Sequence, residues 1–254
     1  MKAILFDLDG TLVQSERLKA RSYAIAAQRL GGLDEPDERA VEAYREIVGS
    51  ERNVASRHIM ESLGLEPLLR PLMAEHGDAE PEAVLTRMRL EIYDAMVADP
   101  QVVRDNEWPH TVGLLRVAKE SFCGTGLATM SQRKEALHVL RALDIEKHLD
   151  VIVSREDVQR QKPDPEIYLL AASKLGVPPG ECLVIEDSVM GVRSGVAAGM
   201  SVIAVATPFT ECSLQRELPV PEEWVVRRTD ALLDTVRRRI EAHNREAHLE
   251  VAGP

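Results

Sequence analysis

The sequence predicts an α/β protein, with a doubly wound parallel sheet and an inserted, all-helical domain. Three observations carry this prediction. Short apolar runs end in polar or small residues, as strands buried on both faces do. Helical patterns lie between most of these runs, and one long stretch near the start of the chain shows helical periodicity alone.

Five short apolar runs are expected to form the strands, because each suits a strand covered on both faces. Three segments between or after them place apolar residues at helical spacing, and Gly176 and Gly199 are expected helix stops. Since strands alternate with helices, we expect a Rossmann-like core with helices on both sides of the sheet. The strand runs are 3–6, 126–128, 151–153, 183–185 and 201–206, and the helical segments are 133–143, 166–175 and 189–198.

The stretch 15–98 breaks this alternation, because it contains helical patterns punctuated by glycines and no strand pattern. We expect it to form a separate helical cap domain, although such helices could also simply cover the sheet. The expected division is a core of residues 1–14 and 99–236, a cap of residues 15–98, and a C-terminal helix and tail of residues 237–254.

Composition excludes several classes of partner. The formal net charge is -11, so the chain has no electrostatic footprint for nucleic acid or for an anionic membrane. No apolar run reaches the length of a membrane span, and residues 1–6 resemble a strand rather than a signal peptide. We expect a cytoplasmic protein. An anionic substrate would be repelled unless a cation or a local basic group intervenes.

The first polar element is Asp7-Leu8-Asp9-Gly10-Thr11, directly after the strand at 3–6. Two carboxylates that leave a buried strand are costly unless something pairs with them, and a divalent hard cation would do so. Gly10 permits the tight turn that aims Asp7 and Asp9 at one site. A pair of capping or loop aspartates is the alternative. The pattern DxDGT, with four fixed residues, rarely arises by chance in a chain of this length.

Two further elements offer neutral or positive groups. Thr129 follows the strand run 126–128, and its hydroxyl can donate to a phosphate oxygen without adding charge, while Ser131 is a candidate cap of the next helix. Lys162 is restricted to an extended backbone by Pro163, which holds an ammonium near a helix entrance. The alternative for Lys162 is a solvated surface lysine.

The last element is Glu186-Asp187-Ser188, after the run 183–185. Adjacent carboxylates point to different faces of a strand end, so one can bind a cation directly while the other works through water or a hydrogen bond. The alternative is a helix start capped by Asp187 or Ser188.

Together these elements predict phosphoryl transfer. In an open parallel sheet, ligands bind outside the carboxyl ends of the strands, so the four elements are expected to meet there. They would combine a nucleophile, a second carboxylate, a hydroxyl donor and a fixed cation with a hard metal. Phosphoryl transfer depends on such positioning and charge neutralisation, and Mg²⁺ is usually held by a few carboxylates together with water and phosphate. We therefore expect a Mg²⁺-dependent enzyme that acts on a small phosphorylated metabolite.

In their order and context, these motifs resemble those of the haloacid dehalogenase superfamily. The segment from Val184-Ile185-Glu186-Asp187 to Ala198-Gly199-Met200 is especially similar to the last motif of that family. The resemblance covers nearly the whole chain. A helical cap between the first and second motifs is similar to the branch of phosphoglycolate phosphatase-like and beta-phosphoglucomutase-like enzymes.

The resemblance implies a role for each acidic residue. Asp7 would attack phosphorus and become an aspartyl phosphate, and Asp9 would protonate the leaving oxygen and then help to activate water. The Asp7 carboxylate, the Asp9 backbone carbonyl and Asp187 would hold Mg²⁺, with Glu186 assisting directly or through water.

The same resemblance implies that Thr129 and Lys162 bind the phosphate, and that the protein is a phosphatase and a monomer. Dehalogenation is not expected, because the dehalogenating members lack an acid at the position of Asp9. Members that cleave phosphonates rely on a lysine in the cap that forms a Schiff base. Lys19 is the only lysine there, so phosphonate cleavage is a poorly supported alternative.

Substrate choice is expected to rest on the cap. The candidate contacts are Ser15, Lys19, Arg52 and Arg89. The two arginines could read a second anionic group, or they could be solvated on helix faces. Lys19 stands where the beta-phosphoglucomutases have a histidine, which favours hydrolysis. Two alternatives stay open: a sugar-phosphate mutase, and a non-catalytic phosphate-sensing module, against which the complete set of core motifs speaks.

Overall fold

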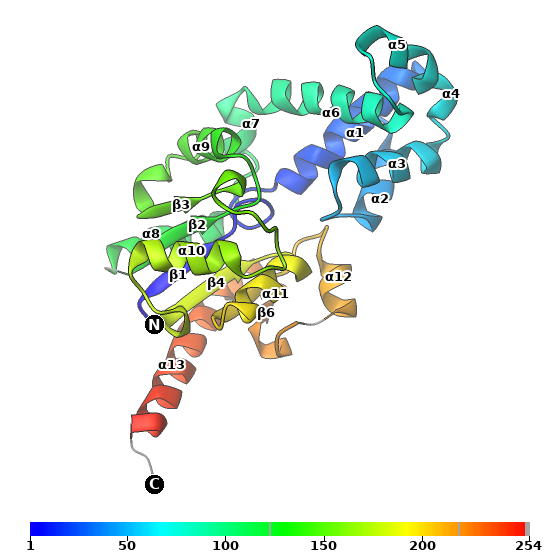
Figure 1. The fold of residues 1–254 in the computed structure, drawn as a ribbon. Helices are drawn as coiled ribbons and strands as arrows, with labels where there is room; N and C mark the ends of the chain where they lie inside the picture. Colours follow the sequence, from blue (N-terminus) through cyan, green and yellow to red (C-terminus); the bar gives the residue numbers. More distant parts are fainter. Residues whose placement is uncertain (122, 218, 252–254) are drawn as a thin grey trace. The chain divides into compact units, whose positions relative to one another are not determined.

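The computed structural model describes residues 1–121, 123–217 and 219–251 (Figure 1). The end of the expected tail, residues 252–254, lies outside the described residues. Contacts divide the chain into two compact units, one of residues 1–14 and 103–254 and the other of residues 15–102.

The first unit contains a six-stranded, all-parallel sheet in the order β3-β2-β1-β4-β5-β6. The predicted parallel sheet is confirmed, but β6 was not predicted, because a strand of two residues is too short to show periodicity. The strands are β1 Ala3–Phe6, β2 Gly124–Ala128, β3 Val151–Val153, β4 Cys182–Glu186, β5 Ser201–Val205 and β6 Val225–Val226.

Helices lie on both faces of this sheet. Ile167 and Tyr168 of α10 and Val192 of α11 are buried in one apolar cluster with Leu5 and Val184, so these helices cover one face (Figure 1). Helices α8 and α13 pack against β2 and β5 and against each other. The helices are α8 Pro109–Glu120, α9 Arg133–Ala142, α10 Glu166–Leu175, α11 Val189–Ala197, α12 Glu211–Arg216 and α13 Leu232–Val251.

The strand order places β1 at the centre of the sheet. All four residues of β1 are buried, since strands flank it and helices cover it. The chain order reverses between β1 and β4, which is the position where open α/β sheets bind ligands at their carboxyl edge. Phe6 is in register with Leu127 of β2 and Ile185 of β4, so the residues that follow these three positions emerge together.

The second unit is helical, and its residues 15–102 contain no strand. Its interior includes the fully buried side chains of Tyr23, Ile59, Leu69 and Leu85. None of the described helices is both long and apolar enough to span a membrane. The helices are α1 Ser15–Gly31, α2 Glu38–Glu46, α3 Arg52–Leu63, α4 Glu66–Leu69, α5 Met73–His76 and α6 Pro81–Val97, and α7 Pro100–Arg104 crosses into the first unit.

Close packing of α11 on the sheet gives a stability prediction. A Cβ atom at Gly195 would lie 2.8 Å from Val202 Cγ2 and 3.4 Å from Val184 Cβ. We expect Gly195→Ala to lower the free energy of unfolding by about 1–3 kcal/mol, because the added methyl overpacks the core. Nothing lies within 4 Å of a Cβ at Gly113 in α8. Gly113→Ala should therefore raise the free energy of unfolding by about 1 kcal/mol, because alanine has the higher helix propensity.

Urea unfolding of the two variants beside the wild type measures both changes. An equal gain in stability for Gly195→Ala and Gly113→Ala would contradict the close approach of α11 to β4 and β5.

Candidate active site

Four of the predicted core residues lie at the carboxyl ends of three neighbouring strands. Asp7 follows β1, Thr129 follows β2, and Glu186 and Asp187 stand at the end of β4. Asp7 N donates to Ile185 O, which extends the pairing of β1 and β4 to this edge. All four residues are buried. The topology therefore brings together motifs that are far apart in the sequence.

Lys162 is the cation of this site. Its Nζ lies 2.7 Å from Asp7 Oδ1, 2.6 Å from Glu186 Oε1 and 3.0 Å from Ala128 O. The Lys162 side chain is only 6% exposed, so the reading of a solvated surface lysine is wrong. The three acceptors match the three protons of an ammonium group, which fixes Lys162 between the two carboxylates.

Glu186 is held by five protein donors. Its Oε1 accepts hydrogen bonds from Lys162 Nζ and Tyr168 Oη, and its Oε2 accepts from the backbone N of Asp187 and from Ser188 N and Oγ. A Cβ at Gly191 would lie 1.8 Å from Oε1, so only glycine leaves room for this carboxylate. Because both oxygens are engaged, Glu186 is oriented by the protein itself.

Asp7, Glu186 and Asp187 form an acidic cluster that fits a metal ion. Each offers a carboxylate oxygen, and these oxygens all lie within 4.8 Å of one another. Opposite ligands of a small divalent cation are about 4.2 Å apart, so the spacing suits such an ion. Gly10, at φ 81, lets the loop pass close to this cluster, since a Cβ there would lie 2.0 Å from Asp187 Oδ2.

Burial changes the acidity of the nucleophile candidate. It raises the pKa of Asp7 to about 8, against the lowering effect of Lys162 and with further increases from Glu186 and Asp9. Burial alone would lower the pKa of the Lys162 ammonium, but Asp7 and Glu186 hold it well above its usual value. A second positive charge beside Asp7 would lower the pKa of its carboxyl and favour the ionised form.

Asp9 is linked to the loop after β2. Ser131 Oγ donates a short hydrogen bond to Asp9 Oδ2, and Ser131 N donates to Thr129 Oγ1 over 3.0 Å. The expectation that Ser131 caps the next helix is wrong, because α9 begins after Gln132. The Ser131 hydroxyl is instead used by the carboxylate of Asp9.

Ser188 serves two purposes at the start of α11. Its Oγ accepts from Gly191 N over 3.0 Å and so caps the helix, as one sequence alternative predicts. The same hydroxyl donates to Glu186 Oε2. The capping interpretation and the site interpretation of this segment are therefore compatible.

The four candidate cap residues belong to the helical unit. Ser15 is buried at the start of α1 and its Oγ has no hydrogen-bond partner among the described residues. Lys19 Nζ pairs with Glu16 Oε1 at 2.7 Å, and Arg52 is exposed at the start of α3.

Arg89 differs from these, because it is buried with 5% exposure and its Nε lacks a hydrogen-bond partner among the described residues. Its guanidinium lies over the rings of Tyr23 and Tyr93, 5.4 and 6.0 Å from their centroids. The alternative of a solvated helix-face arginine is therefore wrong for Arg89.

A family model described as haloacid dehalogenase-like hydrolase matches residues 1–199. The chain belongs to this family of hydrolases. The match includes β1 to β4 and the residues of the site, which agrees with the predicted resemblance.

Haloacid dehalogenase-like relatives include two curated phosphatases. The phosphorylated carbohydrates phosphatase of Thermotoga maritima is 30% identical over 200 residues, which cover 79% of this chain and 82% of the relative. Hexitol phosphatase A of Escherichia coli is 32% identical over 209 residues, 82% of this chain and 84% of the relative.

Among solved structures, a variant of CbbY from Rhodobacter sphaeroides in complex with xylulose-(1,5)bisphosphate has a TM-score of 0.59 and 26% identity, covering 84% of this chain and 89% of that one.

Sequence reasoning on this haloacid dehalogenase-like chain missed two residues that contact the site. Tyr168 donates to Glu186, and Ser131 donates to Asp9. Tyr168 lies in the buried stripe of α10, where a tyrosine hydroxyl must find a partner, so its position was a usable indication. Ser131 offered no such indication, because serine after a strand is usually a cap.

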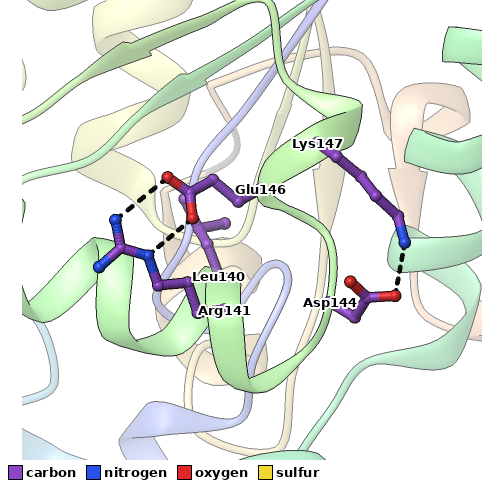
Figure 2. Close-up of a pocket in the computed structure, with 5 residues that line it drawn as sticks. All are labelled: Leu140, Arg141, Asp144, Glu146 and Lys147. Carbon is purple, nitrogen blue, oxygen red and sulfur yellow. Dashed lines mark hydrogen bonds and ion pairs between the residues drawn. The ribbon is translucent and has the colours of Figure 1, made fainter.

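One surface hollow of about 360 Å³ lies at the end of α9 and is lined by residues outside the acidic cluster (Figure 2). Its charged side chains are paired with each other, Arg141 with Glu146 and Lys147 with Asp144, as Figure 2 shows. Each of these surface charges therefore has an ionic partner within the hollow.

The ion pairs of Lys162 give a second stability prediction. We expect Lys162→Met to lower the free energy of unfolding by about 3–5 kcal/mol at neutral pH, because two buried carboxylates lose their cation. Lys134→Met, at an exposed position of α9, is the control and should change the free energy of unfolding by less than about 0.5 kcal/mol. Denaturant unfolding measures both. A Lys162→Met protein as stable as Lys134→Met would show that Asp7 and Glu186 do not depend on this cation.

Proposed function

We propose that this protein is a Mg²⁺-dependent phosphatase that hydrolyses a small phosphomonoester through an aspartyl phosphate on Asp7. The observation that carries the proposal is the buried Asp7 carboxylate, fixed through Oδ1 by Lys162 beside Glu186 and Asp187. The phosphatases among the relatives support the reaction and favour sugar phosphates as the substrate class.

In the proposed reaction, an Asp7 carboxylate oxygen forms a bond to phosphorus while the bond from phosphorus to the ester oxygen breaks. Asp9 gives its proton to the leaving oxygen. In the second half, water attacks the phosphorus of the aspartyl phosphate, Asp9 takes a proton from that water, and the Asp7–phosphorus bond breaks. Lys162, by exchanging one of its three present acceptors for phosphate, and the Thr129 hydroxyl are proposed to bind the phosphate oxygens, where positive charge and hydrogen-bond donors stabilise the transition state.

For the metal, we propose Asp7, Asp187 and the backbone carbonyl of Asp9 as ligands. Glu186 would act from outside this set, because its oxygens already accept five hydrogen bonds. When bound, Mg²⁺ would offset the charge of the phosphate and of the buried carboxylates.

The two compact units are proposed to act as a catalytic core and a cap that selects the substrate. Ser15, Lys19, Arg52 and Arg89 stay our candidates for substrate contacts in the cap. We also propose that the protein works as a monomer in the cytoplasm.

The first activity prediction concerns the nucleophile. Asp7→Asn should lower phosphate release by about 10⁴-fold or more, because an amide cannot attack phosphorus, while the near-isosteric side chain retains the fold. Phosphate release from sugar phosphates, phosphoglycolate, nucleoside monophosphates and para-nitrophenyl phosphate in the presence of Mg²⁺ is the assay. Wild-type release from one or a few compounds is expected. An Asp7→Asn variant that retained this activity would remove Asp7 as the nucleophile.

The second activity prediction concerns the metal. Thorough chelation should stop phosphate release, and added Mg²⁺ should restore it. Calorimetry of Mg²⁺ binding gives a readout besides activity. Loss of a residue that only hydrogen-bonds to a metal ligand lowers metal affinity by about 10–100-fold. Asp187→Asn removes a proposed ligand itself, so it should lower the affinity by at least as much. Asp144→Asn, at an exposed position just after α9, is the matched control. Activity that survives chelation would contradict the metal assignment.

The last prediction concerns Arg89. The buried guanidinium of Arg89 has no ion pair among the residues that the structure describes, and an anionic group of a ligand would stabilise it, so we propose that the substrate carries a second such group. Arg89→Met should raise KM for that substrate by about tenfold or more but leave KM for para-nitrophenyl phosphate nearly unchanged. Arg45→Met, in the same unit, is the control.

An equal effect of Arg89→Met on both substrates would contradict this role. If phosphorus NMR instead detected conversion of a sugar phosphate into its isomer, the protein would be a sugar-phosphate mutase.

A further inference from the structure

Tyr168 is a buried tyrosine whose hydroxyl lies in the charged centre of the site. It belongs to α10, has 0% exposure, and its Oη donates to Glu186 Oε1 over 3.0 Å. The centroid of its ring is 5.0 Å from Lys162 Nζ. One side chain therefore contacts both partners of the ion pair that faces Asp7.

The hydrogen bonds around Glu186 divide into two groups. Oε2 accepts from three donors in the loop that follows β4, and these fix one end of the carboxylate. Among the described residues, Oε1 accepts from Lys162 and Tyr168. The tyrosine hydroxyl and the ammonium thus share one oxygen, and each donor reduces the negative charge that the other meets.

This sharing affects Lys162 directly. Its ammonium is bound to Glu186 Oε1 at 2.6 Å on one side and to Asp7 Oδ1 at 2.7 Å on the other. Without the Tyr168 hydroxyl, Glu186 Oε1 would present its full charge to Lys162. The ammonium would then be drawn toward Glu186 and away from Asp7.

We propose that Tyr168 is a positioning residue, which holds Glu186 and thereby keeps Lys162 directed at Asp7 and at the phosphate that Asp7 receives. The proposal rests on the proposed phosphatase function, and it assigns a task to a hydroxyl that takes no part in bond making. The aromatic ring stays beside Lys162 in Tyr168→Phe, so that variant removes the hydroxyl alone.

The test compares Tyr168→Phe with Thr125→Val. Thr125 is also fully buried, and its hydroxyl lies 2.7 Å from His148 O and 3.1 Å from Asp150 Oδ2, but it is near the opposite end of β2 from Ala128. Both changes delete one buried hydroxyl with nearly constant volume. They should therefore cost similar stability, which urea unfolding measures, but only Tyr168→Phe should alter the site.

Two readouts are expected to separate the variants. The dissociation constant of inorganic phosphate is measured by calorimetry with Mg²⁺ present. This constant and KM for para-nitrophenyl phosphate should both rise about five- to tenfold in Tyr168→Phe, as expected for the loss of one hydrogen bond. Thr125→Val should leave both within about twofold of the wild type. In a Glu186→Gln background, Tyr168→Phe should add little further effect, because the hydroxyl acts through the Glu186 charge.

The opposite results overturn the proposal. The proposal is wrong if Tyr168→Phe leaves the phosphate dissociation constant and KM unchanged, or if Thr125→Val raises both as much as Tyr168→Phe does. It is also wrong if the effects of Tyr168→Phe and Glu186→Gln are fully additive. Failure of the proposed function looks different, since the wild type itself would then neither bind inorganic phosphate nor release it from any ester.

Discussion

The structure of the site depends on the two ion pairs of Lys162. A buried carboxylate without a partner is strongly destabilising, and this site buries Asp7, Glu186 and Asp187 within one cluster. The ammonium contributes a positive charge at hydrogen-bond distance from two of them. The cluster still carries more negative charge than Lys162 can offset. Burial, together with the nearby charges of Glu186 and Asp9, raises the pKa of Asp7 to about 8. A protein that retains such an imbalance has a use for a further cation, which suits a metal-assisted reaction on an anion.

The fold supplies what this interaction needs. Parallel strands end at the same edge, so β1, β2 and β4 deliver Asp7, the Ala128 carbonyl and Glu186 to one place. The reversal of strand order beside β1 leaves that edge available to ligands. Small residues then allow close approach, since side chains at Gly10 and Gly191 would collide with Asp187 and Glu186. The energetic cost of the charged site is offset by the apolar packing of helices such as α10 and α11 on the sheet.

The sequence was sufficient to predict the fold class and the family, because both rest on patterns within single segments. The apolar run before Asp7, its two aspartates and Gly10 predict a strand end and a turn, and the structure confirms the strand and the positive φ of Gly10. Contacts that join segments far apart could not be derived this way. The five donors of Glu186 come from three separate segments of the chain, and Ser131 reaches Asp9 across a separation of 122 residues. The burial of Arg89 likewise depends on the packing of α6 against α1, which periodicity alone leaves open. The catalytic roles of the site residues remain predictions.

The central claim is that Asp7, held by Lys162, forms a covalent bond to phosphorus. The most direct measurement is mass spectrometry of the protein after rapid acid quenching during turnover of a substrate with Mg²⁺ present. The account predicts a peptide containing Asp7 that has gained the mass of one phosphoryl group, with no gain in Asp7→Asn treated in the same way. Turnover without any such adduct, at quench times that resolve a single cycle, would contradict it and favour direct attack by water.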